Sequence, residues 1–207
     1  MKRPLPLQWP AWIALLFAFA LAGCQSTPSR DAPKAYTMKP SLKEETYTQT
    51  VADWPLRFGG HYFDTACYST YGCTVRYGNY FKEDPDEELR RASASVTAYP
   101  DVLGASWGPI RNFPPPAIAT WRSSDGTPHR AEIDMDTIFK NRLIRHNLKR
   151  EELTENQGSL PGIILEVNDR TINVYMKATL WTKEEQIPGN RHSHSRSDLI
   201  KVFSQTY

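Results

Sequence analysis

The sequence lacks both a surplus of charge and a hydrophobic run long enough to span a membrane. Its 207 residues include 25 basic and 23 acidic side chains, and beyond residue 23 the two kinds are equal in number. A protein that binds the nucleic-acid backbone carries a clustered basic surplus, so we expect no nucleic-acid partner. The longest apolar run, residues 12–22, has 11 residues, whereas a membrane-spanning helix needs about 20.

Two common signatures of catalysis are also missing. The sequence contains neither a His-Glu-x-x-His metal motif nor a glycine-rich phosphate loop. We therefore expect a binding protein without a cofactor. A catalytic group assembled in space from distant residues leaves an enzyme as the alternative.

The amino terminus has the order of an export signal, with Lys2 and Arg3 before the apolar run and small residues after it. The stretch Leu21-Ala22-Gly23-Cys24 resembles the lipobox of bacterial lipoproteins, in which the signal is cut before a lipidated cysteine. The resemblance implies a signal peptide at residues 1–23 and an acylated Cys24. An ordinary signal, or a buried helix with an incidental cysteine, is the alternative.

The residues after Cys24 predict where the protein resides. Three acyl chains, at about 0.8 kcal/mol per buried CH₂, bind a membrane permanently. Gln25 occupies the position where lipoproteins kept in the inner membrane usually carry Asp, which implies an outer-membrane anchor facing the periplasm. Residues 24–53 are mostly polar and rich in proline, so we expect a flexible tether. The globular domain is then residues 54–207.

Cys67 and Cys73 form an even pair in an oxidising compartment, where a disulfide is the expected state. The bond closes a short loop, so its chain-entropy contribution is only about 2 kcal/mol. Two buried free thiols are the alternative. A zinc site is less well supported, because no second cysteine or histidine pair completes four ligands.

The domain predicts an α+β fold, mainly an antiparallel β-sheet or sandwich with one packed amphipathic helix. Asp125-Gly126 and Asn168-Asp169 mark turns between β-type runs. From residue 172 to 180, apolar and polar side chains alternate, which predicts one core face and one wet face. The helix is expected from Thr137 to about Lys149. The expected strands are residues 56–63, 73–77, 93–99, 117–122, 129–134, 162–167, 171–180 and 198–203.

Recognition chemistry is concentrated after the first of the two cysteines. Tyr68 and Tyr71 lie between them, and buried tyrosines are frequent anchors of protein contacts. An acidic cluster follows, and complementary charge steers association with a basic partner. The alternatives are an aromatic core and a solvated loop. The acidic residues with this predicted role are Asp84, Asp86, Glu87 and Glu88.

Two further pairs of titratable residues have both a functional and a structural interpretation. His192 and His194 can point the same way on a strand toward a metal, but the flanking arginines favour an exposed loop. Asp134 and Asp136 resemble an acid/base pair, although capping of the following helix is the simpler explanation. We therefore predict no metal site and no catalytic residue.

Residues 113–134, Phe-Pro-Pro-Pro-Ala-Ile-Ala-Thr-Trp-Arg-Ser-Ser-Asp-Gly-Thr-Pro-His-Arg-Ala-Glu-Ile-Asp, precede an Ile-Phe segment. Residues 161–168 form a second block, Pro-Gly-Ile-Ile-Leu-Glu-Val-Asn. Together with the lipobox and tether, these blocks resemble a group of bacterial lipoproteins without an assigned enzymatic activity. Some members are immunity partners of type VI secretion phospholipase effectors. The resemblance covers roughly residues 54–204.

The resemblance implies an immunity protein that blocks the active site of a secreted phospholipase toxin in the periplasm. The acidic cluster would mimic the substrate phosphate in a basic cleft of the toxin. One alternative is a structural or assembly lipoprotein that binds another envelope component. The other is a lipid-anchored hydrolase that uses His192 and His194 to hold a metal.

Overall fold

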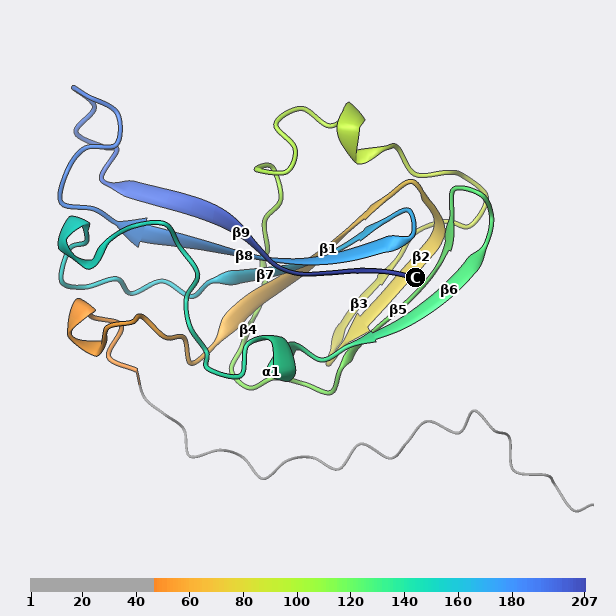
Figure 1. The fold of residues 1–207 in the computed structure, drawn as a ribbon, viewed down its shortest axis with the longest axis horizontal. Coiled ribbons are helices and arrows are strands. Elements are labelled where there is room, and N and C mark those ends of the chain that lie inside the picture. The colour runs from red at the N-terminus through yellow and green to blue at the C-terminus, as the bar shows by residue number, and fades with distance from the viewer. Residues whose placement is uncertain (1–46) are drawn as a thin grey trace, which may run out of the picture. The chain divides into compact units, whose positions relative to one another are not determined.

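The structure is a computed structural model that describes residues 47–207 (Figure 1). The predicted signal peptide, Cys24 and the tether up to residue 46 lie outside the described residues. Most of the regular secondary structure in the described chain is β-strand, with little helix, so the predicted sheet-rich fold is confirmed. The nine strands are β1 (His61–Tyr68), β2 (Thr70–Tyr77), β3 (Tyr80–Glu83), β4 (Trp107–Ile110), β5 (Ala117–Ser123), β6 (Pro128–Ile133), β7 (Gly162–Asn168), β8 (Thr171–Trp181) and β9 (Ser195–Thr206).

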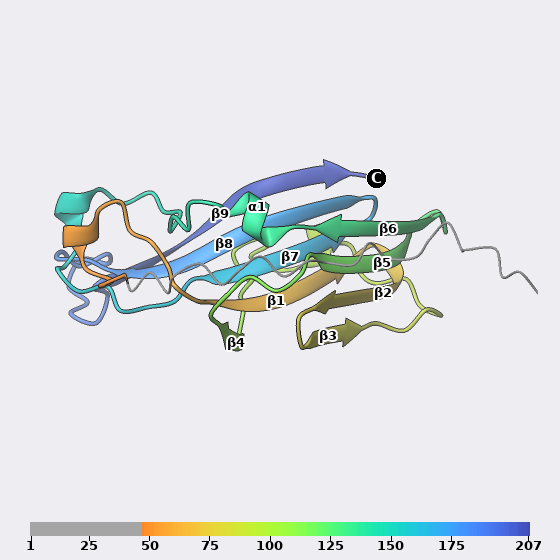
Figure 2. The same ribbon diagram turned by 90° about the horizontal axis from the view of Figure 1, so that it is seen from below.

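The strands form two sheets that lie as layers over one another (Figure 2). The five-stranded sheet has the order β4-β1-β7-β8-β9, and the four-stranded sheet has the order β3-β2-β5-β6. Six of the seven strand pairs are antiparallel, and only β1 and β7 run parallel. The chain crosses from one sheet to the other at Ser69, between β1 and β2.

Both predicted hairpins are present. Asp125 lies in the turn between β5 and β6, where its side chain accepts a hydrogen bond from the Thr127 backbone N–H at 2.9 Å. The turn that joins β7 to β8 is residues 169–170, one position later than predicted, because Asn168 still belongs to β7 and pairs with Thr171. Asp125 and Asp169 therefore both lie in the turns that the sequence predicts.

The predicted helix from Thr137 to Lys149 is wrong. The α-helix α1 covers only Met135–Ile138, although Asp134 caps it as expected by accepting hydrogen bonds from two backbone N–H groups. Beyond it, the backbone of Arg142 and Ile144 bonds to Phe58 and Leu56. These tertiary bonds hold the segment extended, because a residue cannot use the same backbone groups in a helix and in a ladder.

The strand predicted at residues 93–99 is also wrong. Ser93–Ser95 form a short 3₁₀ helix, η2, and the following residues turn. Two other 3₁₀ helices, η1 (Val51–Asp53) and η3 (Arg150–Glu152), lie outside the sheets. Contacts with the domain begin earlier than residue 54, because Thr50 pairs with Asn156.

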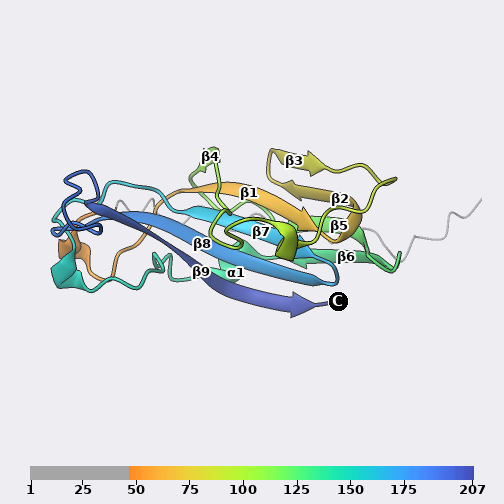
Figure 3. The ribbon, with the colours of Figure 1, turned by 90° about the horizontal axis from the view of Figure 1, so that it is seen from above.

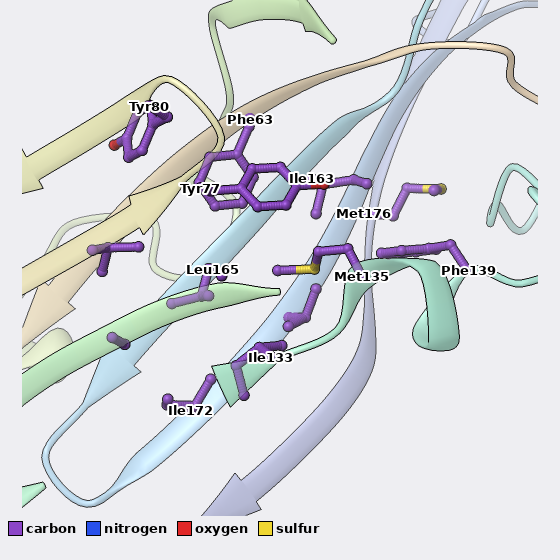
Figure 4. Packing of buried hydrophobic residues seen from close by; sticks show 14 of the residues in the cluster. Phe63, Tyr77, Tyr80, Ile133, Met135, Phe139, Ile163, Leu165, Ile172 and Met176 are labelled. Carbon is purple, nitrogen blue, oxygen red and sulfur yellow. The ribbon is translucent and has the colours of Figure 1, made fainter. Parts of the chain in front are cut away.

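The main core lies between the two sheets (Figure 4). Phe63 and Leu165 come from the five-stranded sheet, and Val75 and Ala119 come from the four-stranded sheet; all are fully buried. Apolar residues spaced as on one face of a helix, Met135, Phe139 and Leu148, are buried too, although they do not form one helix. Hydrophobic spacing thus predicted burial better than backbone conformation.

The opposite face of the five-stranded sheet is covered at Asn173 and Tyr175, although Thr179, further along β8, is exposed as predicted. Asn173 and Tyr175, predicted to face solvent, are buried. A segment of residues 92–106, here called the strap, crosses over this face (Figure 3). Its Leu103 packs with Tyr68, Ile164 and Tyr175 in a second, smaller apolar cluster.

Within residues 47–207, no helix is both long and apolar enough to span a membrane.

Candidate functional site

Five carboxylates gather where β3 ends and the chain continues beside the four-stranded sheet. This set is here called the acidic surface: Glu83, Asp84, Asp86, Glu87 and Glu88. All but Glu88 line a depression of about 720 Å³, together with residues of β5 and β6. Among those residues, Thr120 and Arg122 alternate with buried neighbours along β5, so the depression lies on the outer face of the sheet.

Backbone hydrogen bonds fix the acidic surface onto β2. Asp84 N–H donates to Cys73 O at 2.9 Å, and Gly72 N–H donates to Pro85 O at 3.1 Å. Gly72 has a φ of +53°, and a Cβ there would lie 2.5 Å from Asp86 Oδ1. Glycine is therefore required at position 72 by both conformation and space. The acidic surface is held rigidly rather than carried on a free loop.

Two arginines neutralise part of the acidic surface. Arg122 Nη2 lies 2.8 Å from Asp86 Oδ1, and its guanidinium group lies over the ring of Tyr71. Arg90 Nε lies 3.6 Å from the largely buried Asp84 carboxylate. In the described part of the chain, the other three carboxylates form no ion pair, so the surface keeps a negative excess. These three are Glu83, Glu87 and Glu88, and all are exposed.

The two cysteines are bonded, as predicted, and the bond joins β1 to β2. It therefore links the two sheets instead of closing a surface loop. Tyr68 is only 8% exposed and packs beneath the strap, whereas Tyr71 is half-buried against Arg122. The expectation that a disulfide loop presents both tyrosines is therefore wrong in its geometry. Of the two, only Tyr71 adjoins the acidic surface.

A serine, a histidine and an aspartate meet at the turn between β5 and β6. Ser123 Oγ lies 3.0 Å from His129 Nε2 and donates a hydrogen bond to Asp125 Oδ1 at 2.5 Å. This bond and, next in size, the hydrogen bond from the Thr127 backbone N–H together lower the pKa of the Asp125 carboxyl to about 2. Ser123 is fully buried and has its hydroxyl proton engaged. The group stabilises the turn and does not present a nucleophile.

One sequence pattern was missed. Residues 104–108, Gly-Ala-Ser-Trp-Gly, have the Gly-x-Ser-x-Gly spacing of a hydrolase nucleophile turn. In such enzymes the serine stands between a strand and a helix, but Ser106 is the last residue of the strap and directly precedes β4. Its hydroxyl lies 3.4 Å from Asp64 Oδ2. Among the residues described, no histidine hydrogen bonds to Ser106, so the context of the motif is absent.

The histidine pair lies outside the strands, in the loop that the sequence favoured over a metal-binding strand. His192 lies in an exposed turn and His194 precedes β9. Across residues 47–207, no three His, Cys, Asp or Glu side chains come together in a way that could hold a metal ion. Asp134 and Asp136 are likewise explained locally, since Asp134 caps α1 and accepts from Asp136 N–H.

Comparisons with protein-family models, with curated proteins and with solved structures found no match to this chain.

Two features that shape the site were not predicted. Glu83 ends β3, a strand that the sequence did not reveal, and Arg122 lies on β5 opposite Tyr71. The alternation of Arg122 with buried Trp121 placed it on an outer face, but nothing local showed that Asp86 would pair with it. That contact joins residues 36 positions apart in the chain.

Proposed function

We propose that this protein is a lipid-anchored periplasmic binding protein at the outer membrane. In this proposal it is an immunity protein that blocks the active site of a type VI secreted phospholipase, without chemistry of its own. The lipobox and the resemblance of residues 113–134 and 161–168 support the location and the partner class. The observation that carries the proposal is the rigid acidic surface with three unpaired carboxylates.

The physical argument is mimicry of substrate phosphate. A phospholipase of the phosphodiester-cleaving type holds the lipid phosphate with cationic side chains, and such a cleft attracts carboxylates as well. Glu83, Glu87 and Glu88 are exposed and have no ion pair among the described residues. They are therefore the side chains expected to enter the cleft, in place of the larger set with Asp84 and Asp86 that the sequence predicts.

The backbone bonds that hold the acidic surface in place also favour binding. A surface already held by backbone bonds loses little conformational freedom when a partner binds. Asp86 serves this purpose, because its carboxylate is bonded to Arg122 and its backbone carbonyl accepts a bond from the same guanidinium at 3.0 Å. Asp86 and Asp84 are thus assigned to support, and the glutamates are assigned to recognition.

The test is capture of the partner by the full chain followed by an activity assay. Full-length protein with a carboxy-terminal affinity tag is purified in detergent from cells that carry a type VI secretion system. A phospholipase recovered at close to one-to-one, and inhibited on phospholipid vesicles by added protein, is the expected result. Recovery of envelope assembly proteins or peptidoglycan fragments, with no inhibition of any phospholipase, contradicts the proposal and favours the structural alternative.

A further inference from the structure

The strap covers the five-stranded sheet without joining it through its backbone. Among the described residues, every backbone–backbone hydrogen bond made by residues 92–106 stays within the strap. Side chains supply the polar ties to the sheet. These ties are Tyr99 Oη to Glu166 Oε1 (2.8 Å), Asn168 Nδ2 to Ser93 Oγ (2.8 Å), Lys177 Nζ to the carbonyls of Asp101 (2.6 Å) and Leu103 (2.8 Å), and a longer bond from Ser106 Oγ to Asp64 Oδ2 (3.4 Å).

The closed strap buries a carboxylate without a cation. Glu166 is 0% exposed and accepts hydrogen bonds from Tyr99, Asn173 and Tyr175, all of which are neutral. Two of these donors belong to the sheet itself, and only Tyr99 comes from the strap. A buried carboxylate without a counter-ion is unfavourable compared with one in water. Closure therefore carries a built-in electrostatic penalty.

The backbone of the strap carries a second penalty. Ala98 has a φ of +58°, in the left-handed region that disfavours residues with a Cβ. Apolar contacts oppose both penalties, since Leu103 is 4% exposed and the rings of Tyr99 and Tyr68 meet edge to face at 5.7 Å. The strap is therefore held by a small apolar cluster and opposed by two unfavourable terms, the buried charge and the left-handed backbone. Such a balance is typical of a segment with low local stability.

We propose that the strap is a cover that opens from the five-stranded sheet while the rest of the domain stays folded. Tyr99 is its latch, and the buried charge of Glu166 favours opening. Opening admits water to Glu166 and uncovers the apolar patch of Tyr68, Ile164 and Tyr175. This inference does not rest on the proposed function, because the strap and the acidic surface cover different sheets.

Two variants with opposite expected effects test the cover. Hydrogen exchange is measured by mass spectrometry on the full chain in lipid nanodiscs, with residues 117–123 of β5 as the internal reference. Tyr99→Phe removes a donor to a charged group and is expected to speed exchange in residues 92–106 about tenfold. Glu166→Gln removes the charge and is expected to slow it. Exchange in β5 should stay unchanged in both variants.

Uncovering of the patch is tested by placing a thiol beneath the strap. An Ile164→Cys protein is treated with a thiol reagent, and the labelled peptide is quantified by mass spectrometry. The labelling rate should rise with Tyr99→Phe and fall with Glu166→Gln. A rate that Tyr99→Phe leaves unchanged, or that both variants raise, overturns the proposal.

A matched pair of lysines provides the control. Lys177→Met removes two bonds to strap carbonyls, whereas Lys183→Met removes one bond of the same kind to Glu151 O, away from the strap. Faster strap exchange in the first variant alone supports the cover. The same rate in both variants, or strap exchange that always equals the β5 rate, shows that the strap opens only with global unfolding and overturns the proposal.

Discussion

The two sheets differ in what lies on their outer faces. Along β7 of the five-stranded sheet, residues 162–167 are all buried, because the core covers one face and the strap covers the other. Along β5 of the four-stranded sheet, buried and half-buried residues alternate, which is typical of a sheet with one open face. The acidic surface adjoins this open face, where a partner can reach it.

The two outer faces also differ in the surroundings of their carboxylates. Glu166, on the covered face, is enclosed by three fixed donors and serves the fold. Glu83, Glu87 and Glu88, beside the open face, are exposed and have no ion pair in the described region. A buried carboxylate requires hydrogen bonds, whereas an exposed carboxylate is stabilised by water. The exposed set is therefore the one available for recognition.

The largest expected effect contrasts one isoleucine on each outer face. Ile164 on β7 is 1% exposed beneath the strap, whereas Ile118 on β5 is half-buried. Ile164→Ala should lower the free energy of unfolding by about 3 kcal/mol. Ile118→Ala should lower it by less than about 1 kcal/mol. Urea denaturation of both variants checks the difference, and equal losses would show that the two outer faces are equally covered.

Acid should destabilise the protein by protonating a histidine that is buried between the two sheets. Burial, and then the charge of Arg142, lower the pKa of His61 to about 3 from the ordinary histidine value of 6.5. The unfolded chain therefore binds the proton more readily, and stability falls as the pH drops from 6.5 toward 3. The loss attributable to His61 is about 3 kcal/mol between pH 7 and pH 4.

His61→Phe provides the comparison, because an aromatic ring of similar breadth cannot take up that proton. Urea midpoints measured from pH 7 to pH 4 should fall less steeply in the variant than in the original protein. The same slope in both proteins would show that acid acts elsewhere. His61 also lies 3.2 Å from the Tyr77 hydroxyl, so some loss of stability at pH 7 is expected in the variant.

The disulfide should have a smaller effect, although it links the two sheets. Chain-entropy considerations for its short loop give about 2 kcal/mol. Cys67→Ala combined with Cys73→Ala should lower the free energy of unfolding by about that amount, measured by urea denaturation without reductant. Adding reductant should bring the original protein close to the variant. A loss well above 4 kcal/mol would mean that the sheets do not pack stably without the bond.

Features of the fold that depend on local contacts were predicted, whereas features that depend on contacts between distant residues were not. Asp125-Gly126 and Asn168-Asp169 each set a turn within a few residues, and both hairpins were predicted correctly. The segment after Ile138 has helical spacing, but backbone bonds to Leu56 and Phe58 decide its conformation. Those bonds join residues more than 80 positions apart, so no local pattern could indicate them.

The acidic residues of the candidate site could be predicted from the sequence, but their arrangement in space could not. The acidic residues were recognised from their run in the sequence, but their separation into support and recognition depends on Arg122 and Arg90. Tyr68 was predicted to face a partner because it lies between the two cysteines, but the strap, which no local pattern indicated, covers it. β4 was missed because a four-residue strand containing Pro109 carries little strand signal.

The proposed role of the three exposed glutamates in binding is tested by measuring the affinity of the captured phospholipase for two triple variants. Glu83→Gln, Glu87→Gln and Glu88→Gln remove the unpaired charges, and Glu151→Gln, Glu155→Gln and Glu184→Gln remove three exposed charges elsewhere. Both variants should keep the original stability within about 0.5 kcal/mol. We expect calorimetric titration to show at least about tenfold weaker binding for the first variant only. Equal affinity of both variants and the original protein would contradict the proposed role.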